Sequence, residues 1–316
     1  MWCLRLNRSR HRSIPTRRES SGGATHASVL AATLASAVAL SYALAAHAST
    51  PVFDSVRAAH VPSERLILDR HGAVIHHVRT DDKVRRARWV ALDEVSPALI
   101  DAVLASEDKR FFEHTGVDLR AAAAAAITNL SKGGVVRGAS SISMQVAAMM
   151  DRSLARAADG RSAQQKLDQA QAAWSIEGAW SKQQILETYL NRVYFRGEIQ
   201  GVGAAAEVLF GKAPHGLNAT ESAVLAALIR APQASRAIVE RRSCDVMRSL
   251  DPRADCGHIA YAMDRWGSAA SLRDQGELIA PHLTRLLPAG ATQSTIDRDL
   301  QLAARDAIAK HLQQLG

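Results

Sequence analysis

The sequence predicts a mainly α-helical protein. Alanine is used heavily and favours helix, while aromatic residues make up only 4% of the chain. The apolar share is 47%, so the 316 residues can form a packed core in one large domain or two modest ones. From Ser96 to about Ile238 the residue pattern is helical almost throughout. Short breaks are expected at Gly133-Gly134, Asp159-Gly160, Gly197 and Gly211.

The N-terminal residues hold most of the positive charge. Six arginines and one glutamate in residues 1–26 contribute +5 of the formal net charge of +8, so the high pI does not indicate a nucleic-acid partner. The next twenty residues, ASVLAATLASAVALSYALAA, are uncharged and about long enough to span a bilayer. We therefore expect a basic cytoplasmic tail at 1–26 and a transmembrane signal-anchor at 27–48. The alternative is a cleaved signal peptide that ends at Ala46-His47-Ala48.

A β-hairpin is expected before the helical region. Residues 49–64 look like a linker, and residues 64–82 alternate in polarity around the turn sequence Asp69-Arg70-His71-Gly72. Residues 239–290 are mixed and polar. Residues 292–316 predict a strand-like start, a cap at Asp297 and an amphipathic helix.

Two of the three cysteines lie in one polar stretch. Cys3 belongs to the tail, while Cys244 and Cys256 flank CDVMRSLDPRADC. In an oxidising compartment this pair either closes a small disulfide loop or remains as two free thiols. No second pair lies nearby, which argues against zinc.

The stretch ASEDKRFFEHTGVDLR, residues 105–120, ends an apolar helix with a group of ionisable side chains. A carboxylate at such a helix end, lining a cleft, has its pKa raised by desolvation and can act as a general acid or base. Glu107 fits that description. The alternative interpretation is a solvated helix terminus with a capping aspartate.

Several motifs in this chain resemble those of the peptidoglycan glycosyltransferases, glycosyltransferase family 51. They are EDKRFFEHTGVD at 107–118, RGASSISMQVA at 137–147, WSKQQILETYLNRVYFRGEIQGVGAAAEVLFGKAP at 180–214 and LNATESAVLAALIRAP at 217–232. The details FRGEIQG and SMQVA are most similar to the 1C type of penicillin-binding protein. The resemblance implies a lysozyme-like helical domain at 65–240, on the periplasmic side of a bacterial inner membrane.

The resemblance also implies an activity. Family members polymerise lipid II into β-1,4-linked glycan strands, with inversion and release of undecaprenyl diphosphate. The partners it implies are lipid II, the growing glycan chain, the membrane and other cell-wall synthesis proteins. A pyrophosphate leaving group is compatible with a divalent cation, Mg²⁺ or Mn²⁺, but the motifs identify no metal ligand. The alternative functions are a non-catalytic remnant or scaffold that binds lipid II, and a hydrolase of similar fold.

The motifs assign roles residue by residue. Glu107 matches the general base and Asp108 the adjacent conserved acid, while the second catalytic glutamate of the family falls on Gln169, which cannot ionise. Many relatives carry a cation where this chain has Ala148. The substrate-binding positions are Lys109, Arg110, His114, Arg137, Ser140, Ser141, Gln145, Lys166 and Arg196. The structural positions are Gly116, Asp118, Glu177, Glu187, Tyr189 and Asn191.

Plainer interpretations of some of these residues stay open. Lys166 can be a surface lysine of a helix, and Ser140 or Ser141 can be an N-cap. Glu187 and Asn191 are four residues apart and can simply stabilise their own helix.

Two further expectations concern the ends of the domain. The alanine-rich helix 119–130 is expected to dip into the membrane, as the region between the first two motifs does in the family. The transpeptidase pair of S-x-x-K and K-T-G motifs is not present. Residues 241–316 are therefore expected to be a linker and the start of a truncated transpeptidase region.

Overall fold

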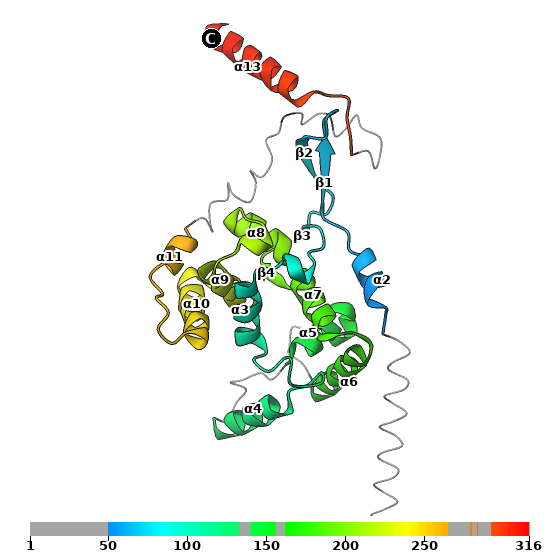
Figure 1. The fold of residues 1–316 in the computed structure, drawn as a ribbon, viewed down its shortest axis with the longest axis vertical. Coiled ribbons are helices and arrows are strands. Elements are labelled where there is room, and N and C mark those ends of the chain that lie inside the picture. The colour runs from blue at the N-terminus through cyan, green and yellow to red at the C-terminus, as the bar shows by residue number, and fades with distance from the viewer. Residues whose placement is uncertain are drawn as a thin grey trace, which may run out of the picture. The chain divides into compact units, whose positions relative to one another are not determined.

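The computed structural model describes residues 50–132, 140–155, 162–264, 279, 283 and 292–315, and they are mainly helical, as predicted (Figure 1). The expected tail at 1–26, the signal-anchor at 27–48 and Arg137 lie outside them. Within the described part, no helix is both long and apolar enough to cross a membrane. The longer helices are α3 (Pro97–Glu107), α4 (Leu119–Ser131), α5 (Ile142–Met150), α6 (Ala163–Ala179), α7 (Lys182–Arg192), α8 (Val202–Phe210), α9 (Ala219–Arg230), α10 (Arg236–Leu250) and α13 (Arg298–Leu315).

The central helix of the core is α9, which packs against α3 and α10. Every residue from Glu221 to Ile229 is buried, because the sequence is apolar around the whole helix. The start of α9 is fixed by a capping box, in which Asn218 and Glu221 bond each other's backbone N–H. The helix therefore provides a rigid support for the neighbouring helices.

Serine side chains start three other helices. The hydroxyls of Ser141, Ser162 and Ser181 accept hydrogen bonds from the backbone N–H groups at the third positions of α5, α6 and α7. The N-cap interpretation of Ser141 is thus confirmed. Predicted breaks at Gly197 and Gly211 are also confirmed. Gly197 adopts positive φ in the turn that precedes α8, and Gly211 adopts positive φ directly after the last residue of α8. The breaks predicted at Gly133-Gly134 and Asp159-Gly160 lie outside the described residues.

The predicted β-hairpin is present. Strands β1 (Glu64–Leu68) and β2 (Val74–Arg79) pair antiparallel. The Asp69 carboxylate accepts hydrogen bonds from the N–H groups of His71 and Ala73, both at 2.8 Å, and so closes the turn.

The predicted C-terminal helix is also present. The segment before it pairs with the hairpin, where the Leu68 N–H donates to the Thr292 carbonyl at 2.7 Å. Asp297 caps α13 by accepting from the N–H of Leu300 at 3.1 Å, as the sequence predicts.

Two short elements were not expected from the sequence. The supposed linker contains helix α2 (Phe53–Ala58), whose Phe53 ring packs edge-on against Trp180 with centroids 5.7 Å apart. A small sheet with strand order β3-β5-β4 joins Arg85–Arg86, Ile199–Gln200 and Tyr194–Arg196. Both depend on contacts between distant residues, which local sequence patterns do not reveal.

The remaining elements are η1 (Leu92–Glu94), η2 (Arg152–Leu154), η3 (Pro214–Gly216) and α11 (Ile259–Ala262).

Helix α10 crosses the domain boundary expected at residue 240. Val239 and Val246 are both buried in the main core, as are Ile259 and Met263, so the packed helical unit extends past residue 240 to at least residue 263. A disulfide joins Cys244 in α10 to Cys256, with the two Cα atoms 5.4 Å apart. Of the two alternatives open from the sequence, the structure supports the disulfide.

Replacing Cys244 and Cys256 with serine is expected to lower the free energy of unfolding by about 3 kcal/mol. The two cysteines are 12 positions apart, and the bond between them closes a loop of that length in the unfolded chain. The midpoint of thermal unfolding under oxidising conditions measures the effect. A reductant should lower the midpoint of the native chain and leave the double variant unchanged. Equal midpoints for the two oxidised proteins would contradict the prediction.

Candidate active site

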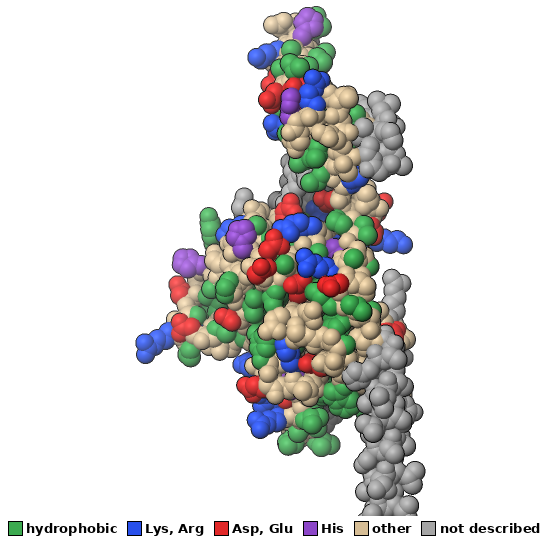
Figure 2. Space-filling model, turned by 45° about the vertical axis from the view of Figure 1, so that its right-hand side comes forward, with side chains coloured by type: hydrophobic (Ala, Val, Ile, Leu, Met, Phe, Trp, Pro, Cys, Tyr) green, Lys and Arg blue, Asp and Glu red, His purple; other side chains and the backbone are tan. Residues whose placement is uncertain are grey.

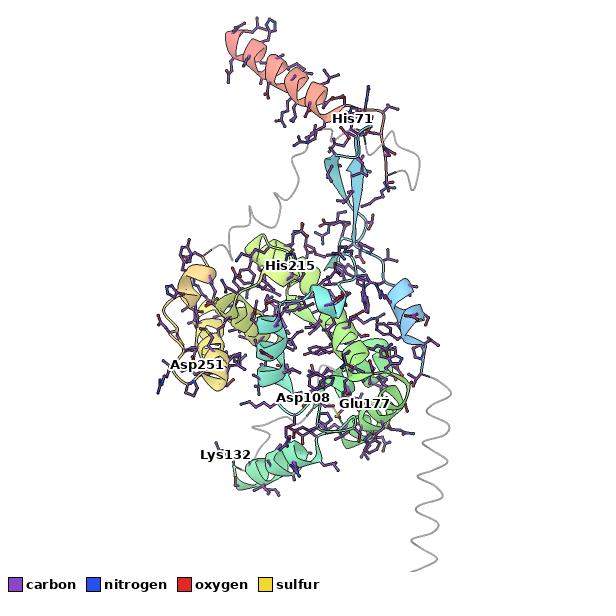
Figure 3. The ribbon with its side chains drawn as sticks, viewed as in Figure 1. His71, Asp108, Lys132, Glu177, His215 and Asp251 are labelled. Atoms are coloured by element: carbon purple, nitrogen blue, oxygen red, sulfur yellow. A yellow bond between two sulfur atoms is a disulfide. The ribbon has the colours of Figure 1, made fainter. Side chains whose placement is uncertain are left out.

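A cavity of about 830 Å³ opens beside the C-terminal end of α3. Its walls come from five helices: the end of α3, the starts of α4 and α5, the end of α9 and one face of α10. In Figure 3, Asp108 lies at the end of α3 that faces α4 and α6. The lining residues with charged side chains are Glu107, Asp108, Lys109, Arg110, Asp118, Arg120, Arg230, Arg242 and Asp245.

Glu107 is the last residue of α3 and is half-buried at the cavity wall. Burial raises the pKa of its carboxyl above the ordinary value, and Asp108 adds to this. A hydrogen bond from the Gln145 Nε2 at 3.2 Å and the charge of Arg230 oppose the rise without cancelling it. The raised pKa makes this carboxylate a stronger base than an exposed glutamate once it is ionised.

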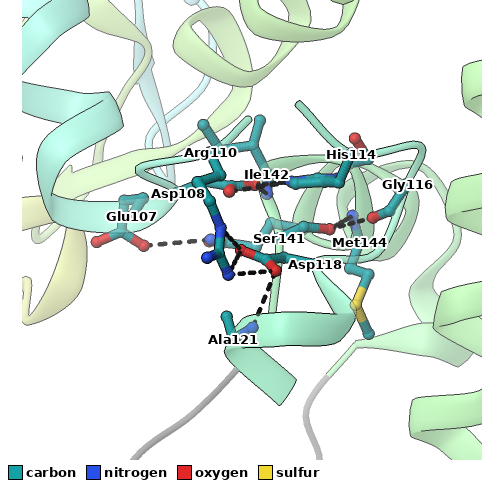
Figure 4. Close-up of polar contacts among 12 residues, drawn as sticks. Glu107, Asp108, Arg110, His114, Gly116, Asp118, Ala121, Ser141, Ile142 and Met144 are labelled. Atoms are coloured by element: carbon teal, nitrogen blue, oxygen red, sulfur yellow. Dashed lines mark hydrogen bonds and ion pairs between the residues drawn. The ribbon is translucent and has the colours of Figure 1, made fainter. Parts of the chain in front are cut away.

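Asp108 holds three segments together (Figure 4). One carboxylate oxygen accepts from the backbone N–H of Ile142, at the start of α5, at 3.0 Å. Both oxygens lie 3.0 Å from Nε2 of His114. Asp108 and His114 thus lie together and anchor the loop that follows Glu107.

The same loop is fixed by a second carboxylate. Arg110 donates two nearly parallel hydrogen bonds to Asp118, from Nε at 3.0 Å and from Nη2 at 2.7 Å. Asp118 also caps α4 by accepting from the Ala121 N–H at 2.9 Å. Burial alone would raise the pKa of Asp118. The hydrogen bonds from Arg110 and from the Ala121 N–H, together with the charge of Arg110, outweigh burial and leave the pKa below its ordinary value. Arg110 lines the cavity while its guanidinium is held in this ion pair, so its expected role in substrate binding stays a prediction.

Gly116 turns this loop against α6. Its φ is +79°, and a Cβ atom there would lie 2.8 Å from Cδ1 of Trp174. The Ser141 hydroxyl donates to the Gly116 carbonyl and ties the loop to the start of α5. A glycine is required at this point for both its conformation and its lack of a side chain.

Gln169 does not lie where the motif comparison puts it. Its side chain is only 1% exposed, and Nε2 donates to the Leu154 carbonyl at 2.6 Å. It faces the contact between α6 and η2 and is not among the described residues that line the cavity. The expected catalytic role is therefore corrected to a structural one. Ala148 packs partly buried against the main core.

Two expected substrate-binding cations also lie apart from the cavity lining. Lys166 is exposed on α6, which fits the surface-lysine interpretation. Arg196 directs Nη1 to the Ala234 carbonyl at 3.2 Å, in the connection between α9 and α10. Ser140, Ser141 and Lys109 do line the cavity, as expected for substrate contacts.

The glutamates expected to be structural have partners that fit that role. Glu177 accepts from the Lys182 Nζ at 2.6 Å, and this ammonium also lies 4.3 Å from the centre of the Phe111 ring. Glu187 accepts from the Trp89 Nε1 at 2.7 Å. These bonds connect α6, α7 and the loops around the cavity to the core.

Asn191 is the third residue of this kind. It exchanges two hydrogen bonds with the backbone of Val90, at 2.9 and 2.8 Å. Its amide also donates to the Glu187 carbonyl within α7 at 2.9 Å. The Asn191 side chain thus stabilises both its own helix, α7, and the segment that leads into α3.

The α10 wall was missed by the sequence interpretation. Arg242, Asp245, Val246 and Ser249 all line the cavity, and Nη1 of Arg242 is buried without a hydrogen-bond partner among the described residues. Their spacing of three, four and seven positions places them on one helical face, and this spacing was the signal available in the sequence. It was overlooked because the domain was expected to end at residue 240.

No group of three or more His, Cys, Asp and Glu side chains in the described ranges is arranged to hold a metal ion. Asp108 and Asp118 are engaged by His114 and Arg110, as described above. Mg²⁺ often binds one or two carboxylates together with the phosphates of a substrate, so the divalent cation expected from the sequence stays a prediction.

Comparisons with known proteins agree with the motif resemblance. The chain is 40% identical over 155 residues to a penicillin-binding protein 1A of Neisseria flavescens, covering 49% of this chain and 19% of that protein. It is 37% identical over 147 residues to penicillin-binding protein 1C of Escherichia coli, covering 46% of this chain and 18% of that protein. The chain thus spans about a fifth of the length of these relatives.

A solved structure and a family model complete the comparison. The crystal structure of penicillin-binding protein 1A from Haemophilus influenzae matches 65% of this chain and 21% of that chain, with 21% identity and a TM-score of 0.32. The family model described as Transglycosylase matches residues 71–251. This match covers more than half of the sequence, and the chain belongs to the transglycosylase family.

Proposed function

We propose that this protein is a peptidoglycan glycosyltransferase that polymerises lipid II, with Glu107 as the general base. The observation that carries the proposal is the half-buried Glu107 carboxylate at the wall of an 830 Å³ cavity that is also lined by cations. The family match and the relatives named above support this type of activity.

The proposed reaction joins two sugars with inversion. The 4-hydroxyl of the acceptor N-acetylglucosamine attacks the anomeric carbon of the lipid-linked donor and loses its proton to Glu107. The new carbon–oxygen bond forms as the bond to the pyrophosphate breaks, and the electron pair leaves with undecaprenyl diphosphate. A raised pKa makes Glu107 a stronger base than an ordinary carboxylate once it is ionised.

The leaving group needs compensating positive charge. Lys109 and Arg120 line the cavity on one side of Glu107, and Arg230 and Arg242 line it on the side of α9 and α10. Cations held in place by a folded wall stabilise charge that develops in the transition state. These cations belong to the chain itself, and no step in this mechanism is derived through a metal ion.

The proposed function is tested with fluorescent lipid II and the full chain in detergent. Long glycan strands from the native chain would support the glycosyltransferase. Binding of lipid II without any polymer would instead favour the non-catalytic alternative, which is motivated by Gln169 and Ala148 at positions where relatives carry ionisable side chains. Release of soluble sugars from purified cell-wall sacculi would point to a hydrolase.

We further propose that α4 contacts lipid. Ile127 and Leu130 are 69% and 83% exposed, and Leu119 is 70% exposed at the start of the same helix. Figure 2 shows hydrophobic side chains gathered at the lower end of the described chain, at the height where Figure 1 places α4. Large apolar side chains in such a group favour a membrane surface over water.

A fluorescent amino acid at position 130 of the full chain in vesicles is expected to be quenched by brominated lipids, because Leu130 would lie at the lipid surface. The control is the same label at Tyr261 on α11, which is 78% exposed and lies well apart from α4 in Figure 1. Steady-state quenching measures the contact. Equal quenching at the two positions would contradict the lipid contact of α4.

A further inference from the structure

We propose that Tyr189 is a positioning residue for this reaction, because it holds the Gln145 amide so that its N–H group points at Glu107. The proposal rests on the proposed role of Glu107 as the base. Sequence comparison suggested only a structural role for Tyr189.

Three helices contribute to this relay. The Tyr189 hydroxyl, on α7, donates to Oε1 of Gln145 on α5 at 3.3 Å. Nε2 of the same amide donates to Oε2 of Glu107 at the end of α3, at 3.2 Å. Both hydrogen bonds run in one direction, from the phenol through the amide to the carboxylate, and hydrogen bonds in such a chain strengthen one another.

An amide has one donor end and one acceptor end, so the orientation of the Gln145 amide decides whether Glu107 faces a hydrogen-bond donor or an acceptor. With Nε2 toward Glu107, the amide favours the ionised carboxylate. With Oε1 toward Glu107, it would favour the protonated acid, which cannot serve as a base. A hydroxyl that donates to Oε1 selects the first orientation.

The environment of Tyr189 keeps its hydroxyl group protonated. Its side chain is 0% exposed. Burial raises the pKa of the phenol well above its usual value, and the nearby carboxylates Glu107 and Asp108 raise it further. The hydroxyl is therefore protonated whenever the base is ionised, and it can donate throughout the working pH range.

The other groups that face Glu107 do not replace the relay. Ser106 donates to the other carboxylate oxygen at 3.2 Å, and Arg230 acts from α9 through its charge. Asp108 opposes ionisation, and Arg242 and Lys109 share the cavity lining. Among the groups that lower the pKa of Glu107, the Gln145 hydrogen bond has the largest effect.

The test is Tyr189→Phe in the full chain, which removes the hydroxyl and keeps the ring in the core. We expect the titration of Glu107 to move to higher pH by about half a unit to one unit. Carbon-13 NMR of protein labelled at the glutamate side-chain carboxyl measures this, with Glu107→Gln used to assign the signal. Polymerisation at pH values below the titration should then fall about threefold to tenfold, and recover at high pH.

Two comparisons keep the result specific. Tyr194→Phe, at a tyrosine that is 44% exposed, should leave the Glu107 titration in place. Adding Tyr189→Phe to Gln145→Leu should give no further shift, because the relay is already broken. A lower melting temperature for Tyr189→Phe with an unmoved Glu107 titration would overturn the proposal, as would additive shifts.

The NMR titration does not depend on turnover. A Glu107 signal that moves in a protein that makes no polymer would support the relay and reject the proposed function. Polymerisation together with an unmoved Glu107 signal would support the proposed function and overturn the relay.

Discussion

Glu107→Gln is expected to lower the rate of lipid II polymerisation by at least about 100-fold, because the glutamine side chain cannot accept the proton of the attacking hydroxyl. Glutamine has nearly the same shape, and its carbonyl oxygen can still accept from Gln145. The loss should therefore appear in the rate of the chemical step, with lipid II binding retained. Single-turnover polymerisation together with a lipid II binding assay separates the two.

Glu113→Gln is the matched control. Glu113 lies in the same loop but is exposed and does not line the cavity. Its replacement should leave the polymerisation rate within about twofold of the native chain, as surface substitutions usually do little. A Glu107→Gln protein with the native rate would show that another group is the base.

The Glu107→Gln replacement should also change the stability of the folded chain. Burial raises the pKa of Glu107 in the folded chain above its unfolded value. Ionisation therefore costs folding free energy, and this cost appears as the pH rises through the ordinary glutamate range toward the folded pKa. Glu107→Gln should melt at a higher temperature than the native chain at pH 8, and the difference should shrink toward pH 4. Native polymerisation should fall as the pH drops through the same titration.

Gly116→Ala is expected to lower the free energy of unfolding by about 2–4 kcal/mol, since it combines a strained backbone with a steric clash. At a φ of +79° the added Cβ would lie 2.8 Å from Cδ1 of Trp174 and 3.1 Å from its backbone nitrogen. The midpoint of thermal unfolding should fall by about 5–10 °C. Activity should fall as well, because the loop between Glu107 and α4 would be displaced.

Gly197→Ala separates the two causes. Gly197 also has positive φ, +54°, but a Cβ there would meet no atom within 4 Å. Its replacement should cost only the backbone term of about 1 kcal/mol. If both variants melt at the same temperature, the contact with Trp174 contributes nothing and the prediction for Gly116 is wrong.

Local features of this fold could be predicted from the sequence. The hairpin turn depends on Asp69 and Gly72, and the cap of α13 on Asp297, and each acts on residues within a few positions of itself. The raised pKa of Glu107 could be predicted because the apolar helix before it required a buried end.

Features that depend on contacts between distant residues could not be predicted from the sequence. Arg230 of α9 and Arg242 of α10 line the same cavity as Glu107 only because α3 packs against these two helices, which lie more than 100 residues away in the sequence. Gln169 matched a catalytic position by motif spacing, but spacing does not show that its side chain faces Leu154. The interpretation of residues 49–64 as a linker failed for the same reason, since Phe53 is apolar enough to pack but its partner Trp180 is far away.

The position of the disulfide within α10 affects how that helix frays. Helix ends open most easily, and opening from the C-terminal end would first release Ser249 and Val246. Cys244 precedes both of these residues in α10 and is held by a covalent bond to Cys256, so unwinding that starts at Leu250 meets a fixed point there. Amide hydrogens before Cys244, including that of Arg242, should therefore exchange with solvent more slowly than those after it. The part of the cavity wall formed by Arg242 is thereby tied more firmly to the core than the part formed by Ser249.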